Sequence, residues 1–162
     1  NCSKLEEVEL REGLQTIGNG TFASCKVLKR IVIPSTVTVI REMAFMNCEK
    51  LEEVELSEGL LTIGEHAFDN CESLKHINLP TTIRTIGNRA FTDAESLLTI
   101  NLPDGIERIG SYAFYQGGLL TLRIPPLITT IPEEMVEHAQ SLFSVELSEN
   151  VTQVQRYAFT RC

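Results

Sequence analysis

The sequence is poor in aromatic and in basic side chains. It has no Trp, 6% aromatic residues, and 14 Lys and Arg against 22 Asp and Glu, which gives a formal net charge of −8. Because phosphate groups are bound by clustered Lys and Arg, we expect no nucleic-acid partner for a chain this acidic. No apolar run approaches the ~18 residues of a membrane-spanning helix, so we expect no membrane insertion.

Motifs of catalysis are also missing. The sequence contains no G-x-S-x-G, H-E-x-x-H or P-loop pattern, and its three His residues are scattered. The acidic pairs Glu6-Glu7 and Glu52-Glu53 stand side by side on predicted exposed strands, where neighbouring side chains point in different directions. We therefore expect no enzymatic activity, no catalytic residue, no cofactor and no bound metal.

What the chain does have is an internal repeat. The segment LEEVELREGLQTIGNGTFASC from Leu5 and the segment LEEVELSEGLLTIGEHAFDNC from Leu51 agree at 14 of 21 positions. The same pattern recurs between and after them. We predict a single array over residues 1–162 with seven copies of ~23 residues and one residue deleted before the sixth. The copies start at Leu5, Leu28, Leu51, Leu74, Leu97, Leu119 and Leu142.

Apolar residues fall at fixed places in each copy. With the leading Leu as position 0, aliphatic residues stand at positions 3, 5, 9 and 12, an Ala-Phe pair or near equivalent at 16 and 17, and a small residue at 20. Alternation around positions 3 and 5 is typical of a half-buried strand. One copy cannot bury these side chains alone, whereas stacked copies can. We predict a solenoid with parallel strands and a central column of Phe22, Phe45, Phe68, Phe91 and Phe114.

The spacing L-x-x-I-x-L-P-x-x-V-x-x-I-G-x-x-A-F-x-x-C resembles the BspA-like leucine-rich repeat family. The resemblance covers the whole chain. It implies a β-rich α/β repeat solenoid that is curved and right-handed, with a parallel sheet on its concave side and short turns or single helical turns on its convex side. It also implies a role in adhesion or protein recognition. The sixth copy departs from the pattern at Pro132, Met135-Val136 and Ala139.

The five cysteines share one place in the repeat. Cys2, Cys25, Cys48, Cys71 and Cys162 all stand at position 20, where other copies have Ala or Gly. A small buried slot accepts all three residue types, and a buried thiol behaves as a small apolar group. The alternative, a zinc site or a disulfide framework, lacks the short C-x2-C spacing and places stacked thiols farther apart than a disulfide needs.

A candidate protein-binding face lies on the predicted concave sheet. Side chains at positions 2 and 4 should point away from the core, and position 1 joins them where it becomes apolar. The acidic and basic copies alternate in the first half, either to fix the stacking order or to select a partner. The predicted binding residues are Glu7, Glu9, Arg30, Glu53, Glu55, His76, Asn78, Leu98, Thr99, Asn101, Leu120, Thr121, Arg123, Phe143, Ser144 and Glu146.

The strongest functional signal in this face is an apolar stripe at position 1. Leu98, Leu120 and Phe143 replace the charged residues of the first four copies. Contiguous exposed apolar surface often marks an interaction site. The alternative is that these side chains tuck under the preceding turn and are partly buried.

The surroundings of the chain stay open at this stage. Three N-x-S/T triplets, at Asn1, Asn19 and Asn150, are typical of a glycosylated extracellular chain. Neither end of the array carries a polar cap, so we expect either a piece of a longer array or end-to-end contacts through the terminal repeats. We predict a non-catalytic protein-binding module for adhesion or recognition. An intracellular scaffold or a structural subunit of a larger assembly is the alternative.

Overall fold

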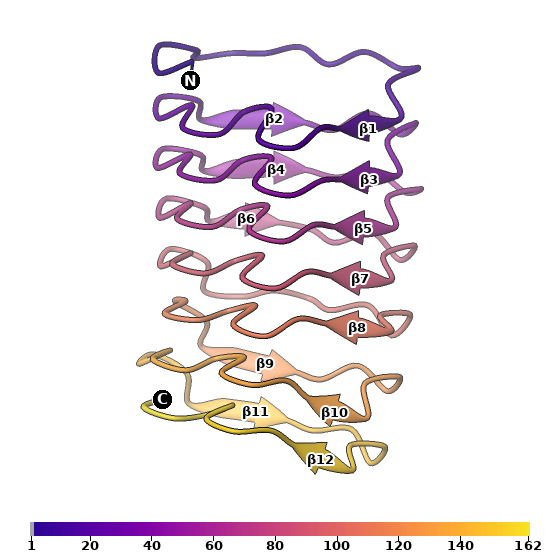
Figure 1. Cartoon of the computed structure of the whole chain (residues 1–162), viewed down its shortest axis with the longest axis vertical. Coiled ribbons are helices and arrows are strands. Elements are labelled where there is room, and N and C mark those ends of the chain that lie inside the picture. The colour runs from indigo at the N-terminus through magenta and orange to yellow at the C-terminus, as the bar shows by residue number, and fades with distance from the viewer. Residues whose placement is uncertain (1) are drawn as a thin grey trace.

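Two rows of very short strands run along the molecule. The computed structural model describes residues 2–162 and is a β-solenoid in which each turn of the chain, here called a coil, follows one sequence repeat (Figure 1). The front row is named for its place early in each repeat and is the paler, more distant row in Figure 1. It contains β2 (Arg30–Val32), β4 (Glu53–Glu55), β6 (His76–Ile77), β9 (Thr121–Arg123) and β11 (Ser144–Glu146). The second row contains β1 (Thr16–Ile17), β3 (Val39–Ile40), β5 (Thr62–Ile63), β7 (Thr85–Ile86), β8 (Arg108–Ile109), β10 (Thr130–Ile131) and β12 (Gln153–Val154).

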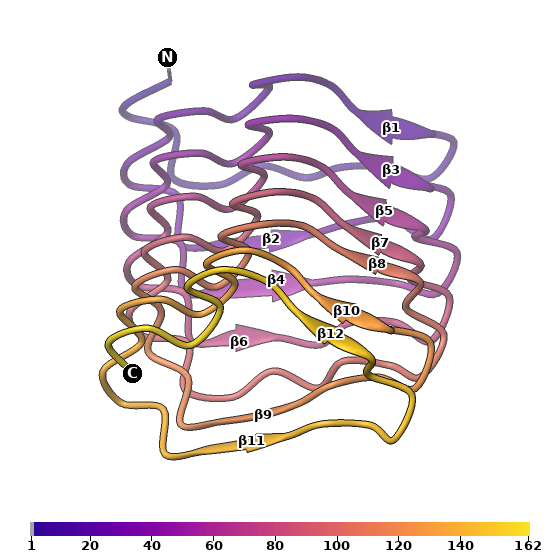
Figure 2. The ribbon, with the colours of Figure 1, turned by 60° about the horizontal axis from the view of Figure 1, so that its bottom comes forward.

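Neighbouring strands in both rows are parallel and in the same register. Arg30 pairs with Glu53 in the front row and Thr16 with Val39 in the second row, so each partner lies one repeat further along the chain. The front row forms the sheets β2-β4-β6 and β9-β11, and the second row forms β1-β3-β5-β7-β8 and β10-β12. The two rows lie on opposite sides of the coil, as Figure 2 shows. The predicted parallel solenoid is therefore confirmed.

A column of phenylalanine rings fills the space between the rows and the turns. The rings of Phe22, Phe45, Phe68, Phe91 and Phe114 are stacked, with centroids 5.2–5.7 Å apart and planes within 12° of parallel. All five side chains are buried, together with the repeating aliphatic residues. Ring pairs at such separations gain attraction beyond the area that they bury. The predicted column is confirmed.

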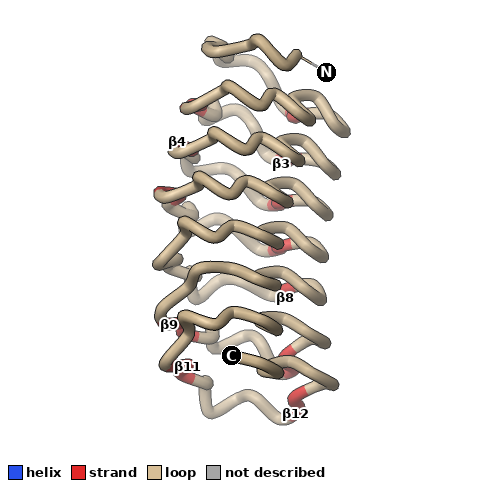
Figure 3. Tube along the Cα trace, turned by 90° about the vertical axis from the view of Figure 1, so that its left-hand side faces the viewer, coloured by secondary structure: helices blue, strands red, loops and turns tan. Residues whose placement is uncertain are grey.

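Of the two predicted alternatives for the side opposite the predicted sheet face, short turns or single helical turns, the helical turns are wrong. Residues 2–162 contain no helix, and Figure 3 shows only loop between the strands on this side. Every coil instead places a residue of positive φ at positions 15 and 19, for example Met43 (57°) and Asn47 (59°), whereas a right-handed helix requires negative φ throughout. Consistent with this, the described part of the chain offers no helix for crossing a membrane.

The alternating backbone explains why a helix is not formed. The N–H of Phe45 donates to the carbonyl oxygen of Ala67 in the next coil at 2.8 Å, while the N–H of Cys48 donates within its own coil to Phe45 at 3.2 Å. Positive φ at every fourth residue turns alternate N–H groups along the solenoid axis. A helical turn would bond these groups within one coil, and the coils would lose a row of hydrogen bonds that joins them.

Side-chain clamps join coils in pairs at the edge between the two rows. The carboxylate of Glu58 accepts hydrogen bonds from the N–H and the hydroxyl of Thr81, both at 3.0 Å, and these bonds lower the pKa of Glu58. Gly59 has a φ of 106° and donates its N–H to the Thr82 hydroxyl at 3.0 Å. Glu12 makes the equivalent contacts one pair of coils earlier. The clamp therefore recurs at the same position of the two copies that start at Leu5 and Leu51.

Replacing one residue of positive φ by glycine should stabilise the protein. Met43→Gly removes the steric cost of a left-handed residue, and the Met43 side chain that is lost is 42% exposed, so the free energy of unfolding should rise by about 0.5–1 kcal/mol. Met46→Gly, three residues later and without positive φ, should lower it. Chemical denaturation of both variants measures the difference, and equal destabilisation by both would contradict the left-handed geometry.

Candidate functional site

The front row presents the predicted binding residues. In β2 and β9 the outer residues Arg30, Val32, Thr121 and Arg123 are exposed while the central residues are buried. All the predicted residues are exposed except Glu53, Glu55 and Leu120, which are half-buried. The structure thus gathers the predicted set on one surface, and which of its members touch a partner stays a prediction.

The half of the face nearer the N-terminus is a grid of charged side chains. Arg30 of β2 forms an ion pair with Glu53 at 3.1 Å and a second ion pair with Glu55, which lies in β4 together with Glu53. Lys75 of the following coil pairs with Glu52 at 2.8 Å. These carboxylates and cations therefore satisfy one another between coils, as the stacking interpretation of the charge alternation predicts.

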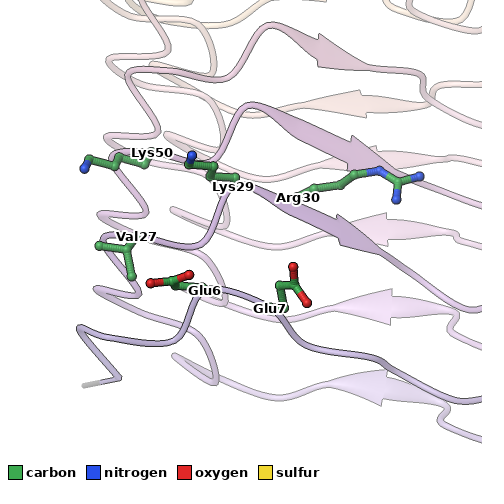
Figure 4. Close-up of a pocket in the computed structure, with 6 residues that line it drawn as sticks. All are labelled: Glu6, Glu7, Val27, Lys29, Arg30 and Lys50. Carbon is green, nitrogen blue, oxygen red and sulfur yellow. The ribbon is translucent and has the colours of Figure 1, made fainter.

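A shallow cleft lies between the first two coils of this grid. It has a volume of about 400 Å³ and is lined by Glu6, Glu7, Val27, Lys29, Arg30 and Lys50. Figure 4 shows the two carboxylates on one wall and the cations on the other. Among residues 2–162 no ion pair within 4.0 Å bridges these walls, because Arg30 pairs with the third coil instead. The cleft can therefore hold charged groups of either sign.

The other half of the face carries the apolar stripe. The side chains of Leu98 and Phe143 are 49% and 77% exposed, while Leu120 between them is half-buried. The N–H of Leu120 donates to Leu98 at 2.9 Å and that of Phe143 donates to Leu120 at 3.0 Å, so the three residues are neighbours on successive coils. The tucked alternative therefore applies in part to Leu120 alone.

The flanks of the stripe are polar but nearly uncharged. Thr99, Thr121 and Ser144 are exposed beside it. The cation of β9, Arg123, is held by Asp104 at 2.7 Å. An apolar surface with neutral polar neighbours can be dehydrated at little electrostatic cost, which suits a docking face.

The cysteines follow the buried-slot prediction in the middle of the array. Cys25, Cys48 and Cys71 are buried free thiols, and the Cys48 thiol donates to the carbonyl oxygen of Phe22 at 3.1 Å. Cys2 and Cys162 are free and exposed in the first and last coils, and the Cys162 thiol still donates to the carbonyl oxygen of Val136 at 3.2 Å, which is the contact that Cys48 makes with Phe22 at the same repeat positions. Within residues 2–162 no group of His, Cys, Asp or Glu side chains is arranged to hold a metal ion.

One hollow was not predicted from the sequence. It lies where the repeat is one residue short and is lined by Glu95, Gln116, Gly117, Gly118, His138, Gln140 and Ser141. The deletion itself was the only available signal. It shows where the coil shortens, but not which side chains of the neighbouring coils come to line the gap.

The glycosylation triplets give a mixed outcome. Asn19 and Asn150 are exposed. The side-chain amide nitrogen of Asn150, which would carry a glycan, donates a hydrogen bond to the carbonyl oxygen of Pro126 at 2.9 Å. Asn1 lies outside the described residues.

Comparison with protein families decides what kind of array this is. The model of the BspA type leucine rich repeat region matches residues 1–93 and 61–162, with six copies. The chain belongs to this family. No curated protein is detectably similar to this leucine-rich repeat chain.

Solved leucine-rich repeat structures from bacteria share the fold. A leucine-rich repeat protein from Bacteroides ovatus is 32% identical with a TM-score of 0.87, covering 91% of this chain and 38% of its own. The T. pallidum leucine rich repeat protein is also 32% identical, with a TM-score of 0.84, covering 89% and 69%. A leucine rich cell surface protein from Faecalibacterium prausnitzii is 25% identical with a TM-score of 0.51, covering 96% and 38%. This repeat array thus spans well under half of the B. ovatus protein.

Burial should make the central thiols unreactive at alkaline pH. Desolvation raises the pKa of Cys48 to about 12, so in the folded protein it should resist alkylation at pH 9, while the exposed Cys2 reacts. Partial burial also raises the pKa of Cys162, which should react more slowly than Cys2. Mass spectrometry after iodoacetamide treatment, with and without denaturant, measures this.

The same thiol makes stability depend on pH. Between pH 9 and about 12 the unfolded chain loses the Cys48 proton and the folded chain keeps it. The free energy of unfolding should therefore fall as pH rises through this range. A Cys48→Ala variant should show a shallower fall, and identical pH profiles for the two proteins would contradict the assignment.

Proposed function

We propose that this leucine-rich repeat array is a non-catalytic protein-binding module that binds its partner through the front row of strands. The observation that carries the proposal is the exposed apolar stripe of Leu98, Leu120 and Phe143 on successive coils. Large exposed aromatic and aliphatic side chains are the residues from which binding energy is typically obtained at the centre of an interface.

The fold supports this role physically. The residues of the stripe are held by inter-coil hydrogen bonds and rest on a packed core, so little backbone order has to be gained on binding. The charged grid in the other half is satisfied internally, so it contributes less to affinity than to the choice of orientation.

A role in adhesion or recognition at a cell surface is the more specific part of the proposal. It is supported by the likeness to the F. prausnitzii protein, which is described as a cell surface protein. It is also supported by membership of the BspA-type family.

Charged substitutions in the stripe test the binding face. Leu98→Asp and Phe143→Asp should each weaken binding to a captured partner, for example one found in a panel of immobilised host-matrix and cell-surface proteins. The expected loss is about 30-fold, as for an interface hot spot of about 2 kcal/mol. Binding is measured by surface plasmon resonance.

Leu61→Asp is the matched control. Leu61 is an exposed leucine beside the second row of strands, so this variant should keep the affinity of the unmodified protein. Thermal unfolding checks that all three variants are folded. If the stripe variants bind as tightly as the control, the front row is not the binding face.

A further inference from the structure

The fifth coil is one residue shorter than its neighbours. Between position 20 and the next leading Leu the fourth coil has Glu95 and Ser96 and the sixth has Gln140 and Ser141, whereas the fifth has Gly118 alone. The N–H of Gly118 donates to Ala94 at 3.2 Å, and a Cβ at this glycine would lie 1.8 Å from the Glu95 carbonyl oxygen. Gly118 therefore packs closely against the fourth coil, where no side chain would fit, and the missing residue leaves a gap beside it at the edge of the coil.

This gap is the hollow described above, and we refer to it as the notch. Its volume is about 390 Å³, within the range of about 300–1,000 Å³ that is usual for small-ligand sites. The residues that line it are polar or glycine, and they include Glu95, Gln116, Gln140, Ser141 and Gly117-Gly118. His138 forms one further wall, and its Nε2 already accepts a hydrogen bond from Arg161 at 3.1 Å.

The notch borders the apolar stripe. Gly118 precedes Leu120 by two residues, and Ser141 precedes Phe143 by two, so the Cα atoms within each pair are at most about 7 Å apart. A single extended segment of a partner can therefore cover the stripe and place one side chain in the notch. Elsewhere along the array the corresponding edge carries two residues per coil, such as Glu49 and Lys50.

Among the residues that line the notch, Glu95 supplies the negative charge. Beyond the lining, Arg161 donates to His138 at 3.1 Å and the Glu137 carboxylate lies 3.9 Å from the same ring, so these two opposite charges stand together on that wall. Near Glu95, the carboxylates of Asp69 and Glu72 add negative charge around Asp93. Partial burial and then the charges of Asp69, Glu95 and Glu72 raise the pKa of Asp93, with only Arg89 acting in the opposite direction. A cationic group entering here gains attraction, and an anionic one is repelled.

We infer that the notch receives an arginine or lysine side chain of the partner, whose neighbouring apolar residues lie on Leu98, Leu120 and Phe143. The inference rests on the proposed function. The Glu95 carboxylate accepts the charged head, and the amide oxygens of Gln116 and Gln140 accept its remaining N–H groups. A guanidinium suits this set because its planar fork offers several donors at once.

Short peptides that differ only in charge test the inference. The probes are acetyl-Phe-Arg-Leu-amide and the same peptide with uncharged citrulline in place of arginine, titrated into the ¹⁵N-labelled protein at millimolar concentration. We expect both peptides to shift the amide resonances of Leu98, Leu120 and Phe143. Only the arginine peptide should also shift those of Gly117 and Gly118, and it should bind about five- to tenfold more tightly.

A pair of variants assigns the effect to the notch. Glu95→Gln should reduce the affinity for the arginine peptide to that for the citrulline peptide. Glu49→Gln, at the same repeat position in a coil of full length, should leave it unchanged.

The outcomes separate the two proposals. Equal binding of both peptides along the stripe, or no effect of Glu95→Gln, overturns the inference and leaves the binding face standing. Shifts that avoid the stripe, or no shifts with either peptide, count against both the inference and the proposed function.

Discussion

Every part of this protein depends on coils covering one another. A coil of 23 residues exposes its leucines, isoleucines and phenylalanine when alone, and only its neighbours remove that surface from water. The stacked rings from Phe22 to Phe114 show the result: each ring packs on the next at 5.2–5.7 Å. The backbone on the turn side also joins the coils, because alternate N–H groups donate to carbonyl oxygens of the next coil and not to those of their own coil.

The surface of the front row divides into two halves with different tasks. Near the N-terminus, Arg30 and Lys75 form ion pairs with carboxylates of the third coil, so their charge contributes to the order in which coils stack. Nearer the C-terminus, Leu98 and Phe143 have no such internal partner and remain exposed. One repeat pattern thus supports a structural surface and a binding surface side by side.

The one-residue deletion matters because the array is otherwise so regular. A missing residue in a loop would usually be absorbed by local rearrangement, but here the fourth and sixth coils keep their full length. The strand pairing of the second row is interrupted at the same place, because β8 and β10 belong to different sheets. The gap therefore persists as the notch, next to the stripe. A local irregularity in a stacked array becomes a surface feature that neighbouring coils cannot fill.

Much of the fold follows from the sequence alone. The spacing of aliphatic residues determines which side chains face the core, and the Ala-Phe pair determines the column of Phe22, Phe45, Phe68, Phe91 and Phe114, because the inner copies bury the same repeat positions. The outward direction of the predicted face residues follows from strand alternation, so it too could be predicted from the sequence.

Other features were decided only by the tertiary structure. The positive φ at Met43 and Asn47 depends on acceptors in the next coil, a non-local hydrogen-bond pattern that local propensity does not report. Arg30 forms its ion pairs with carboxylates of the third coil and not with Glu6 or Glu7 of the first coil. This pairing depends on the side-chain geometry between coils. The lining of the notch comes from three coils at once. The sequence by itself thus determined what is buried, and the stacking decided which polar groups meet.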